Sequence, residues 1–120
     1  MAPARKSFSR SNRLVHAQQY RQVFEHNFRI RDEYITLLIG HQRGDQPRLG
    51  FAIAKKQVKR AVDRNRLKRL FRESFRLNQQ DLPDVDMVIM VRQNILKLTH
   101  SEIYLRLNKL WQKVIERCEN

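Results

Sequence analysis

The stretch from Lys55 to Arg76 reads KKQVKRAVDRNRLKRLFRESFR, and it decides how the rest of the chain is interpreted. It carries ten of the 25 lysines and arginines and only two acidic residues. On a helix, at about 100° per residue, its apolar side chains gather on one side and its cations on the other. The expected buried arc is Leu67, Leu70, Phe71, Ser74 and Leu77. The stretch therefore predicts a helix with one buried face and one cationic face.

The cationic face contains a row of basic residues spaced four apart: Arg64, Lys68, Arg72 and Arg76. Like charges at this spacing destabilise a helix by a few tenths of a kcal/mol per pair, and Glu73 is expected to relieve Arg69 but not the row. A polyanionic partner would offset this repulsion, because each neutralised phosphate releases counterions. Guanidinium groups suit bidentate phosphate contacts, and Asn65 offers a donor and an acceptor to a base edge or ribose. The row favours a docking surface for nucleic acid over a merely solvated face.

Size and composition point the same way. The chain has 120 residues, which suits one domain with a modest core, and its net charge of +13 indicates a nucleic acid or an anionic membrane as partner. No apolar run approaches the ~20 residues of a membrane span, and the basic N-terminus lacks the apolar region of a signal peptide. Cys118 is the only cysteine, so no internal disulfide can form and a cytoplasmic location is expected.

Three segments precede the basic stretch. Residues 1–12 read as a basic flexible arm, followed by a domain over residues 13–118. Leu14–Asn27 has helical periodicity, with Tyr20 and Phe24 on one side. Phe28–Gln42 reads as a strand and Arg48–Ala54 as a second one, and the two are expected to pair as a hairpin across the Gly-Pro turn.

The second strand has two unequal faces. Leu49, Phe51 and Ile53 alternate with small residues, so one face packs and the other lets a backbone or ligand approach closely. The basic helix is expected to begin between Arg60 and Asp63 and to end near Asn78–Gln80, before the break at Leu82–Pro83.

The remaining segments complete an α+β fold. Asp86–Arg92 is a continuous apolar run suited to a buried central strand. Strand, helix and strand in succession predict a crossover between parallel strands, and about 98% of such crossovers are right-handed. Thr99 and Glu102 form a capping box, and Trp111 is the largest core residue of the helix that follows.

Catalytic chemistry is not expected of the protein itself. A two-metal nuclease needs several converging carboxylates, but the only acidic cluster, Asp81, Asp84 and Asp86, lies beside Pro83. The four histidines are scattered, none has zinc-ligand spacing, and the three glycines form no phosphate-binding loop. We therefore expect a binding protein with no catalytic residues and no metal-ligating side chains.

The run AVDRNRLKRLFRE at Ala61–Glu73 resembles the RNR signature of the bacterial ribonuclease P protein subunit. Ala52–Lys56, AIAKK, resembles that family's strand ending in Lys-Lys, and the likeness extends in segment order from Arg13 to about Trp111. The resemblance implies a single-domain α/β sandwich with a small mixed four-stranded sheet. It also implies a left-handed βαβ crossover, as in certain ribosomal proteins, against the handedness expected on general grounds.

The resemblance also implies a function. In ribonuclease P the RNA subunit performs the magnesium-dependent hydrolysis that removes the 5′ leader of precursor tRNA, and the protein binds that RNA and the leader. The implied partners are therefore ribonuclease P RNA and precursor tRNA, with no membrane and no obligate protein partner. Mg²⁺ would act through the RNA rather than through protein side chains.

Two sets of residues follow from this reading. Those expected to grip the catalytic RNA are Lys56, Lys59, Arg60, Arg64, Asn65, Arg66, Lys68, Arg69 and Arg72. Those expected to line a cleft for the leader are Arg13, Tyr20, Phe24, Phe51, Lys55 and Arg92. Phe51 and Arg92 depend on strand register, because a shift of one residue moves a side chain to the other face.

Three other functions compete with this one. A ribosomal or general RNA-binding protein of the same fold would differ only in its partner. A DNA-binding basic-region protein would need a heptad zipper after the basic helix, where Pro83 and an apolar strand stand instead. A protein-only nuclease would cleave without any RNA subunit.

Overall fold

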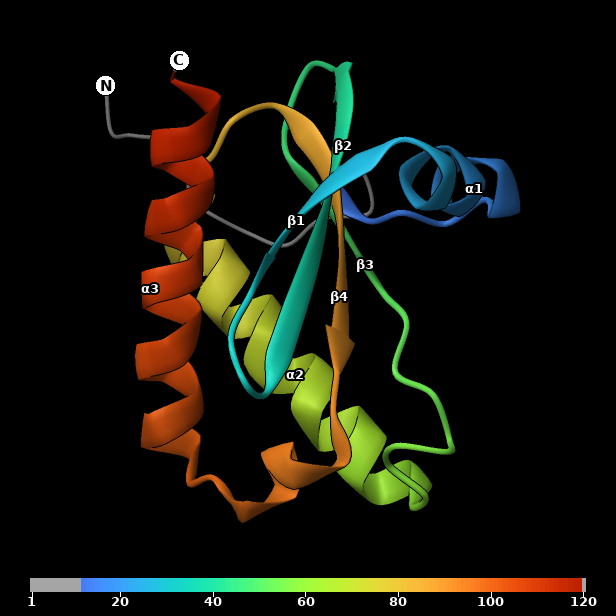
Figure 1. The fold of residues 1–120 in the computed structure, drawn as a ribbon, viewed down its shortest axis with the longest axis vertical. Coiled ribbons are helices and arrows are strands. Elements are labelled where there is room, and N and C mark those ends of the chain that lie inside the picture. The colour runs from blue at the N-terminus through green and yellow to red at the C-terminus, as the bar shows by residue number, and fades with distance from the viewer. Residues whose placement is uncertain (1–11, 120) are drawn as a thin grey trace, which may run out of the picture.

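A computed structural model describes residues 12–119, so all of the expected N-terminal arm except Asn12 lies outside the described residues. The described chain forms one four-stranded sheet with helices on both faces (Figure 1). The elements in chain order are α1 (Ala17–Glu25), β1 (Asn27–Arg31), β2 (Ile35–Arg43), β3 (Arg48–Phe51), α2 (Ala61–Asn78), β4 (Val85–Val91), the short 3-10 helix η2 (Gln93–Lys97) and α3 (His100–Cys118). The expected mixed α+β class is confirmed. No helix within residues 12–119 is long and apolar enough to cross a membrane.

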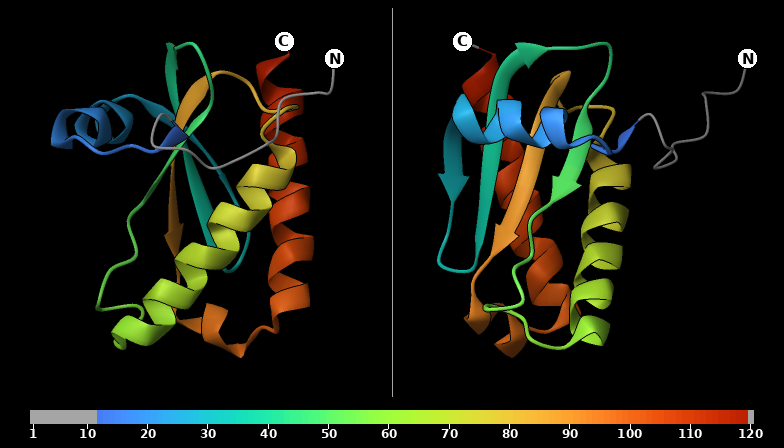
Figure 2. Two further views of the ribbon diagram at one scale, coloured as in Figure 1. Left: turned by 180° about the vertical axis from the view of Figure 1, so that it is seen from behind. Right: turned by 90° about the vertical axis from the view of Figure 1, so that its right-hand side faces the viewer.

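The helices divide between the two faces of the sheet. α2 and α3 cover one face, and α1 crosses the other near one end of the strands (Figure 2). The larger core lies under α2 and α3, whereas a small cluster around Val23, Leu38 and Val88 lies under α1. Because α1 is only nine residues long, it leaves much of its face of the sheet uncovered.

The strand order is β1-β2-β4-β3, and it corrects two expectations. The segment expected as one strand over Phe28–Gln42 is two strands, which pair antiparallel with each other. Asp32 makes the reversal, because its Oδ1 accepts hydrogen bonds from the backbone N–H groups of Tyr34 and Ile35 at 2.7 and 2.8 Å. The hairpin expected between Phe28–Gln42 and Arg48–Ala54 is wrong, since β4 lies between β2 and β3.

β4 is the buried central strand that its apolar run predicts. It pairs antiparallel with β2 and parallel with β3. In the right-hand view of Figure 2, β3 and β4 run side by side in one direction, with α2 behind the sheet and β4 to the left of β3. The connection from β3 through α2 to β4 is therefore left-handed, as the resemblance implied and against the general preference.

The buried face of α2 matches the predicted arc except at one end. Leu67, Leu70, Phe71 and Ser74 are buried as expected, but Leu77 is 54% exposed and Phe75 is fully buried instead. Phe75 and Leu77 lie on opposite borders of the arc, and Phe75 is the one that meets α3. Its ring packs edge-on against Trp111, with centroids 6.1 Å apart.

Trp111 joins the two helices on this face. It is fully buried, and its indole N–H donates to the hydroxyl of the buried Ser74 at 2.9 Å. The Thr99–Glu102 capping box that starts α3 is also present as predicted. Ser74 therefore belongs in the apolar arc because a buried indole needs an acceptor there.

Ser74→Ala should destabilise the protein by about 1–2 kcal/mol, because it leaves the Trp111 N–H buried without a partner. Urea denaturation would measure the loss, with the exposed Ser101→Ala as control. In a Trp111→Phe background the same substitution should be nearly neutral. An undiminished cost in that background would show that the hydrogen bond is not the cause.

Candidate nucleic-acid interface

The loop that enters α2 is held in place by buried and hydrogen-bonded groups. Val58 is fully buried, and a single Arg64 nitrogen donates to the carbonyls of Val58 and Lys59, each at 2.9 Å. Gln57 accepts a hydrogen bond from the backbone of Gln93. Arg64, expected to grip RNA, therefore uses two of its donors to fix the loop that presents Lys55, Lys56 and Lys59.

The outer face of α2 presents most of the predicted cations to solvent. Asn65, Arg66 and Arg69 are exposed, and Lys68 and Arg72 are half-buried. The exposed residues just before the helix are Lys56, Lys59 and Arg60. Arg66 forms an ion pair with Asp63 one turn earlier, at 3.2 Å. Surface ion pairs of this kind contribute little to stability. Eight of the nine predicted RNA-gripping residues are thus exposed or half-buried on α2 or just before it, and the ninth, Arg64, clamps the loop.

Arg72 has a distinct environment. Its guanidinium carbon lies 5.1 Å from the centroid of the Phe51 ring, which itself stacks on Phe71 at 6.4 Å. Its Nε is buried and has no hydrogen-bond partner within the described part of the chain. Burial lowers the pKa of Arg72, and the positive charge of Arg13 lowers it further. An anion placed beside these two arginines would relieve both effects.

Arg13 reaches this place through the segment before α1. The backbone of Arg13 bridges that of Leu49 in β3, and the N–H of Leu14 donates to the Leu49 carbonyl at 3.1 Å. Arg13 was assigned to the leader set by resemblance, but the structure brings it beside Arg72 of the RNA-gripping set. The two predicted sets therefore meet along the β3 edge.

Tyr20 attaches α1 to the sheet. Its hydroxyl oxygen accepts a hydrogen bond from the Phe51 N–H at 3.1 Å. Its ring lies over Gly50, where an added Cβ would come within 2.7 Å of the ring. The close approach expected on the bare face of this strand is therefore made by Tyr20, and glycine is required for contact rather than for backbone conformation.

Phe24 and Phe51 occupy different places. Phe24 is 47% exposed on α1. It follows Tyr20 by four residues, so the two side chains lie on the same face of the helix. The Phe51 side chain points to the opposite face of the sheet, into the α2 core. The structure thus does not bring the Phe51 ring together with those of Tyr20 and Phe24.

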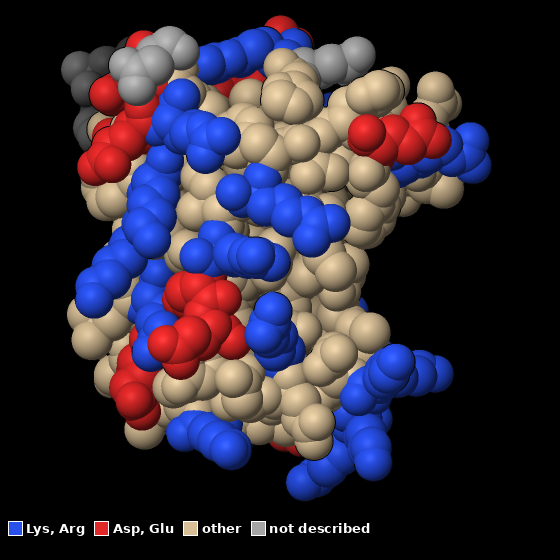
Figure 3. All heavy atoms as spheres, in the orientation of Figure 1, with Lys and Arg blue, Asp and Glu red and all other residues tan. Residues whose placement is uncertain are grey.

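Arg92 and Lys55 border the open part of the sheet on the α1 side. Arg92 is exposed and follows Met90 by two residues, so it shares a face with Met90 and Val88, which pack under α1. Lys55 is exposed on the loop after β3. Figure 3 shows the molecular outline hollowed between α1 and basic side chains below it. Tyr20 and Phe24 come from α1, Lys55 comes from the loop after β3, and Arg92 directly follows β4.

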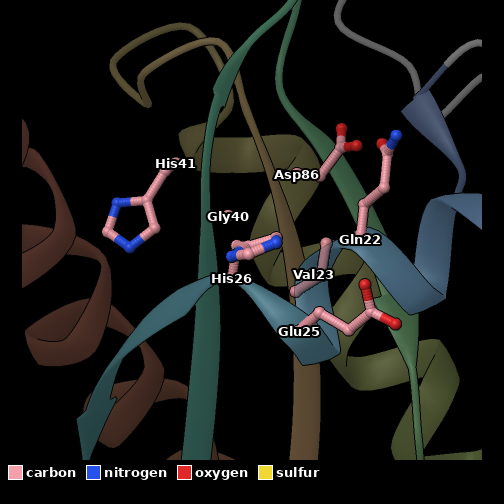
Figure 4. A pocket seen from close by; sticks show the side chains of 7 residues that line it. All are labelled: Gln22, Val23, Glu25, His26, Gly40, His41 and Asp86. Carbon is pink, nitrogen blue, oxygen red and sulfur yellow. The ribbon is translucent and has the colours of Figure 1, made fainter.

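A pocket on the other side of α1 was not predicted (Figure 4). Gln22, Val23, Glu25, His26, Gly40, His41 and Asp86 line it. Asp86 is held by the guanidinium of Arg48 at 2.6 and 2.8 Å, and the His41 ring points away from the other side chains. With two carboxylates it does not suit a phosphate. The sequence signal was Gly40, a residue without a side chain inside a strand.

Comparison with known proteins identifies the family to which the chain belongs. Residues 8–115 match the family model for Ribonuclease P. The chain belongs to the ribonuclease P protein family. The ribonuclease P protein component of Pseudoalteromonas atlantica is 45% identical over 113 residues, which cover 94% of each chain. That of Pseudoalteromonas translucida is 42% identical over 113 residues, covering 94% of this chain and 81% of the relative.

Solved ribonuclease P proteins share the fold. The Staphylococcus aureus RNase P protein superposes with a TM-score of 0.78 at 22% identity, covering 87% of this chain and 97% of the other. The Thermotoga maritima protein gives 0.74 at 26% identity, covering 85% and 96%. Membership in the ribonuclease P family makes this chain a component of that endoribonuclease and excludes the DNA-binding basic-region alternative.

The described residues contain no group of three or more His, Cys, Asp or Glu side chains that could hold a metal ion. This finding concerns residues 12–119 only. The expectation that Mg²⁺ acts through the RNA subunit stays a prediction.

Gly50→Ala should destabilise the protein by about 1–3 kcal/mol, because the new methyl group overlaps the Tyr20 ring. With Tyr20→Ala already present, Gly50→Ala should be neutral or slightly stabilising, since its backbone conformation suits alanine. Urea denaturation of the four proteins gives the coupling as a double-mutant cycle. An equal cost in both backgrounds would mean that Tyr20 does not impose the glycine.

Proposed function

We propose that this component of ribonuclease P binds the catalytic RNA through the outer face of α2 and the loop before it. The observation that carries the proposal is the one-sided charge of α2, whose opposite face is buried against the sheet and α3. Asn65, Arg66, Lys68, Arg69 and Arg72 make the phosphate and ribose contacts. Arg64 acts mainly by holding the loop that presents Lys56, Lys59 and Arg60.

Arg72 is a phosphate-binding site of this surface, with Arg13 nearby. Arg72 is half-buried and fixed over the Phe51 ring, so little side-chain freedom is lost on binding. Phe51, assigned to the leader cleft by resemblance, serves here as the support of Arg72. Arg13 extends the site from the β3 edge.

The 5′ leader of precursor tRNA binds in the hollow on the α1 side of the sheet. Phe24 offers an exposed ring for base stacking, and Lys55 and Arg92 bind the backbone phosphates. Tyr20 forms the wall of this site while it anchors α1. The RNA subunit carries out the magnesium-dependent hydrolysis, in the cytoplasm, and the protein supplies no catalytic group and needs no other protein.

Reconstitution tests the proposal directly. Purified protein should stimulate precursor tRNA cleavage by ribonuclease P RNA at low magnesium and should cleave nothing alone. Arg66→Gln with Arg69→Gln should lower the slope of log affinity against log salt for ribonuclease P RNA by about 1.5, because two phosphate contacts are lost. The charge-matched control is Arg21→Gln with Lys97→Gln, two exposed residues outside the surface.

Cleavage by the protein alone would favour a protein-only nuclease. Equal affinity for ribosomal RNA and ribonuclease P RNA would favour the general RNA-binding alternative. An unchanged salt slope in the α2 variant would remove α2 from the interface.

Phe24→Ala should weaken binding of precursor tRNA with a leader by roughly 5- to 150-fold, since one stacked base contributes about 1–3 kcal/mol. Binding of leaderless tRNA and the melting temperature should not change, because the ring is exposed. The control is Val15→Ala, which removes a similarly exposed apolar side chain. Equal loss on both RNAs would contradict a leader site at Phe24.

A further inference from the structure

A second basic surface lies at the other edge of the sheet from α2. It is a groove between the edge strand β1 and the helix α3, lined by Arg29, Ile30, Arg31, Lys113, Glu116 and Arg117. We call it the β1–α3 groove. Figure 3 shows lysine and arginine side chains gathered over these two elements, on the face turned to the viewer in Figure 1. The function proposed above makes no use of it.

The four cations of the groove outnumber its one carboxylate, Glu116. None of the ion pairs among residues 12–119 involves Arg29, Arg31, Lys113 or Arg117. On α3, Lys109, Lys113 and Arg117 follow each other at i, i+4 and i+8, which disfavours the helix as the row on α2 does. Two elements far apart in the sequence thus bring like charges together.

Ordinary structural roles explain only part of this charge. Lys113 and Arg117 lie in the C-terminal part of α3, where cations interact favourably with the helix dipole. That reason does not extend to Arg29 and Arg31, which come from a strand. The guanidinium of Arg117 is also held 4.9 Å from the centroid of the Phe28 ring, so one wall of the groove has a fixed cation.

We infer that the β1–α3 groove binds the phosphate backbone of a second RNA segment, so that RNA contacts both edges of the sheet. The inference rests on the proposed function in that it takes RNA as the principal ligand. Three of the four lining cations are arginines, whose planar donors match phosphate oxygens. β1 is a short edge strand bearing two arginines, which disfavours pairing with a strand of a protein partner.

The test uses the full-length protein bound to ribonuclease P RNA without precursor tRNA, because the control residue Lys97 lines a pocket together with Arg92 of the proposed leader site. The groove variant, Arg29→Gln with Lys113→Gln, should lower the salt slope by about 1.5, whereas the charge-matched Arg21→Gln with Lys97→Gln should leave it nearly unchanged. Combined with Arg66→Gln and Arg69→Gln, the reduction should reach about 3, since distant sites add. All substituted residues are exposed, and unchanged melting temperatures check the fold.

The outcomes separate this inference from the proposed function. If the α2 variant lowers the slope and the groove variant behaves as the control, the α2 interface stands and the groove inference is overturned. If neither lowers it, the proposed function itself fails. Loss of affinity for polyglutamate or anionic vesicles with an unchanged RNA slope would assign the groove to another partner and overturn the inference.

Chemical protection gives a second, direct measurement. Bound RNA should slow acetylation of the Lys113 amine several-fold relative to that of Lys97, because the backbone covers the groove. Equal acetylation of both lysines in the free and bound protein would place no RNA there, whatever the salt slopes show.

Discussion

The cationic face of α2 depends on the burial of its opposite face. Leu67, Phe71 and Phe75 are almost completely buried, and together they hold the helix against the sheet and α3. Burying three such side chains contributes several kcal/mol, which exceeds the few tenths per pair that the basic row costs. The apolar contacts therefore determine which way the arginines point.

The residues of β3 position side chains on both faces of the sheet. Phe51 makes a contact on each face of the sheet. Its backbone N–H donates to Tyr20 on the α1 face, and its ring lies beneath Arg72 on the α2 face. Gly50 next to it leaves room for the Tyr20 ring. One four-residue strand thus helps to position both α1 and Arg72 of α2, so the two proposed RNA surfaces share this support.

Much of this arrangement could be predicted from local patterns. The extent of α2, the central strand β4 and the capping box of α3 follow from periodicity and capping residues. The strand pairing did not follow, because an aspartate turn at Asp32 carries no glycine or proline to mark it. The sequence also could not show that Phe75 rather than Leu77 is buried, since both border the apolar arc and only the position of Trp111 decides between them.

The candidate site shows the same limit. The RNR run made the cations of α2 recognisable, but their separate roles depend on contacts that no pattern contains, such as the two carbonyls bound by Arg64. For Phe51, alternation alone could not say which face the ring would take. The parallel pairing of Leu49 with Met87 and Phe51 with Ile89 turns these side chains to the α2 core. The Phe51 ring therefore lies beneath Arg72 instead of facing the proposed leader site. Register therefore determines which of two RNA segments each aromatic residue can contact.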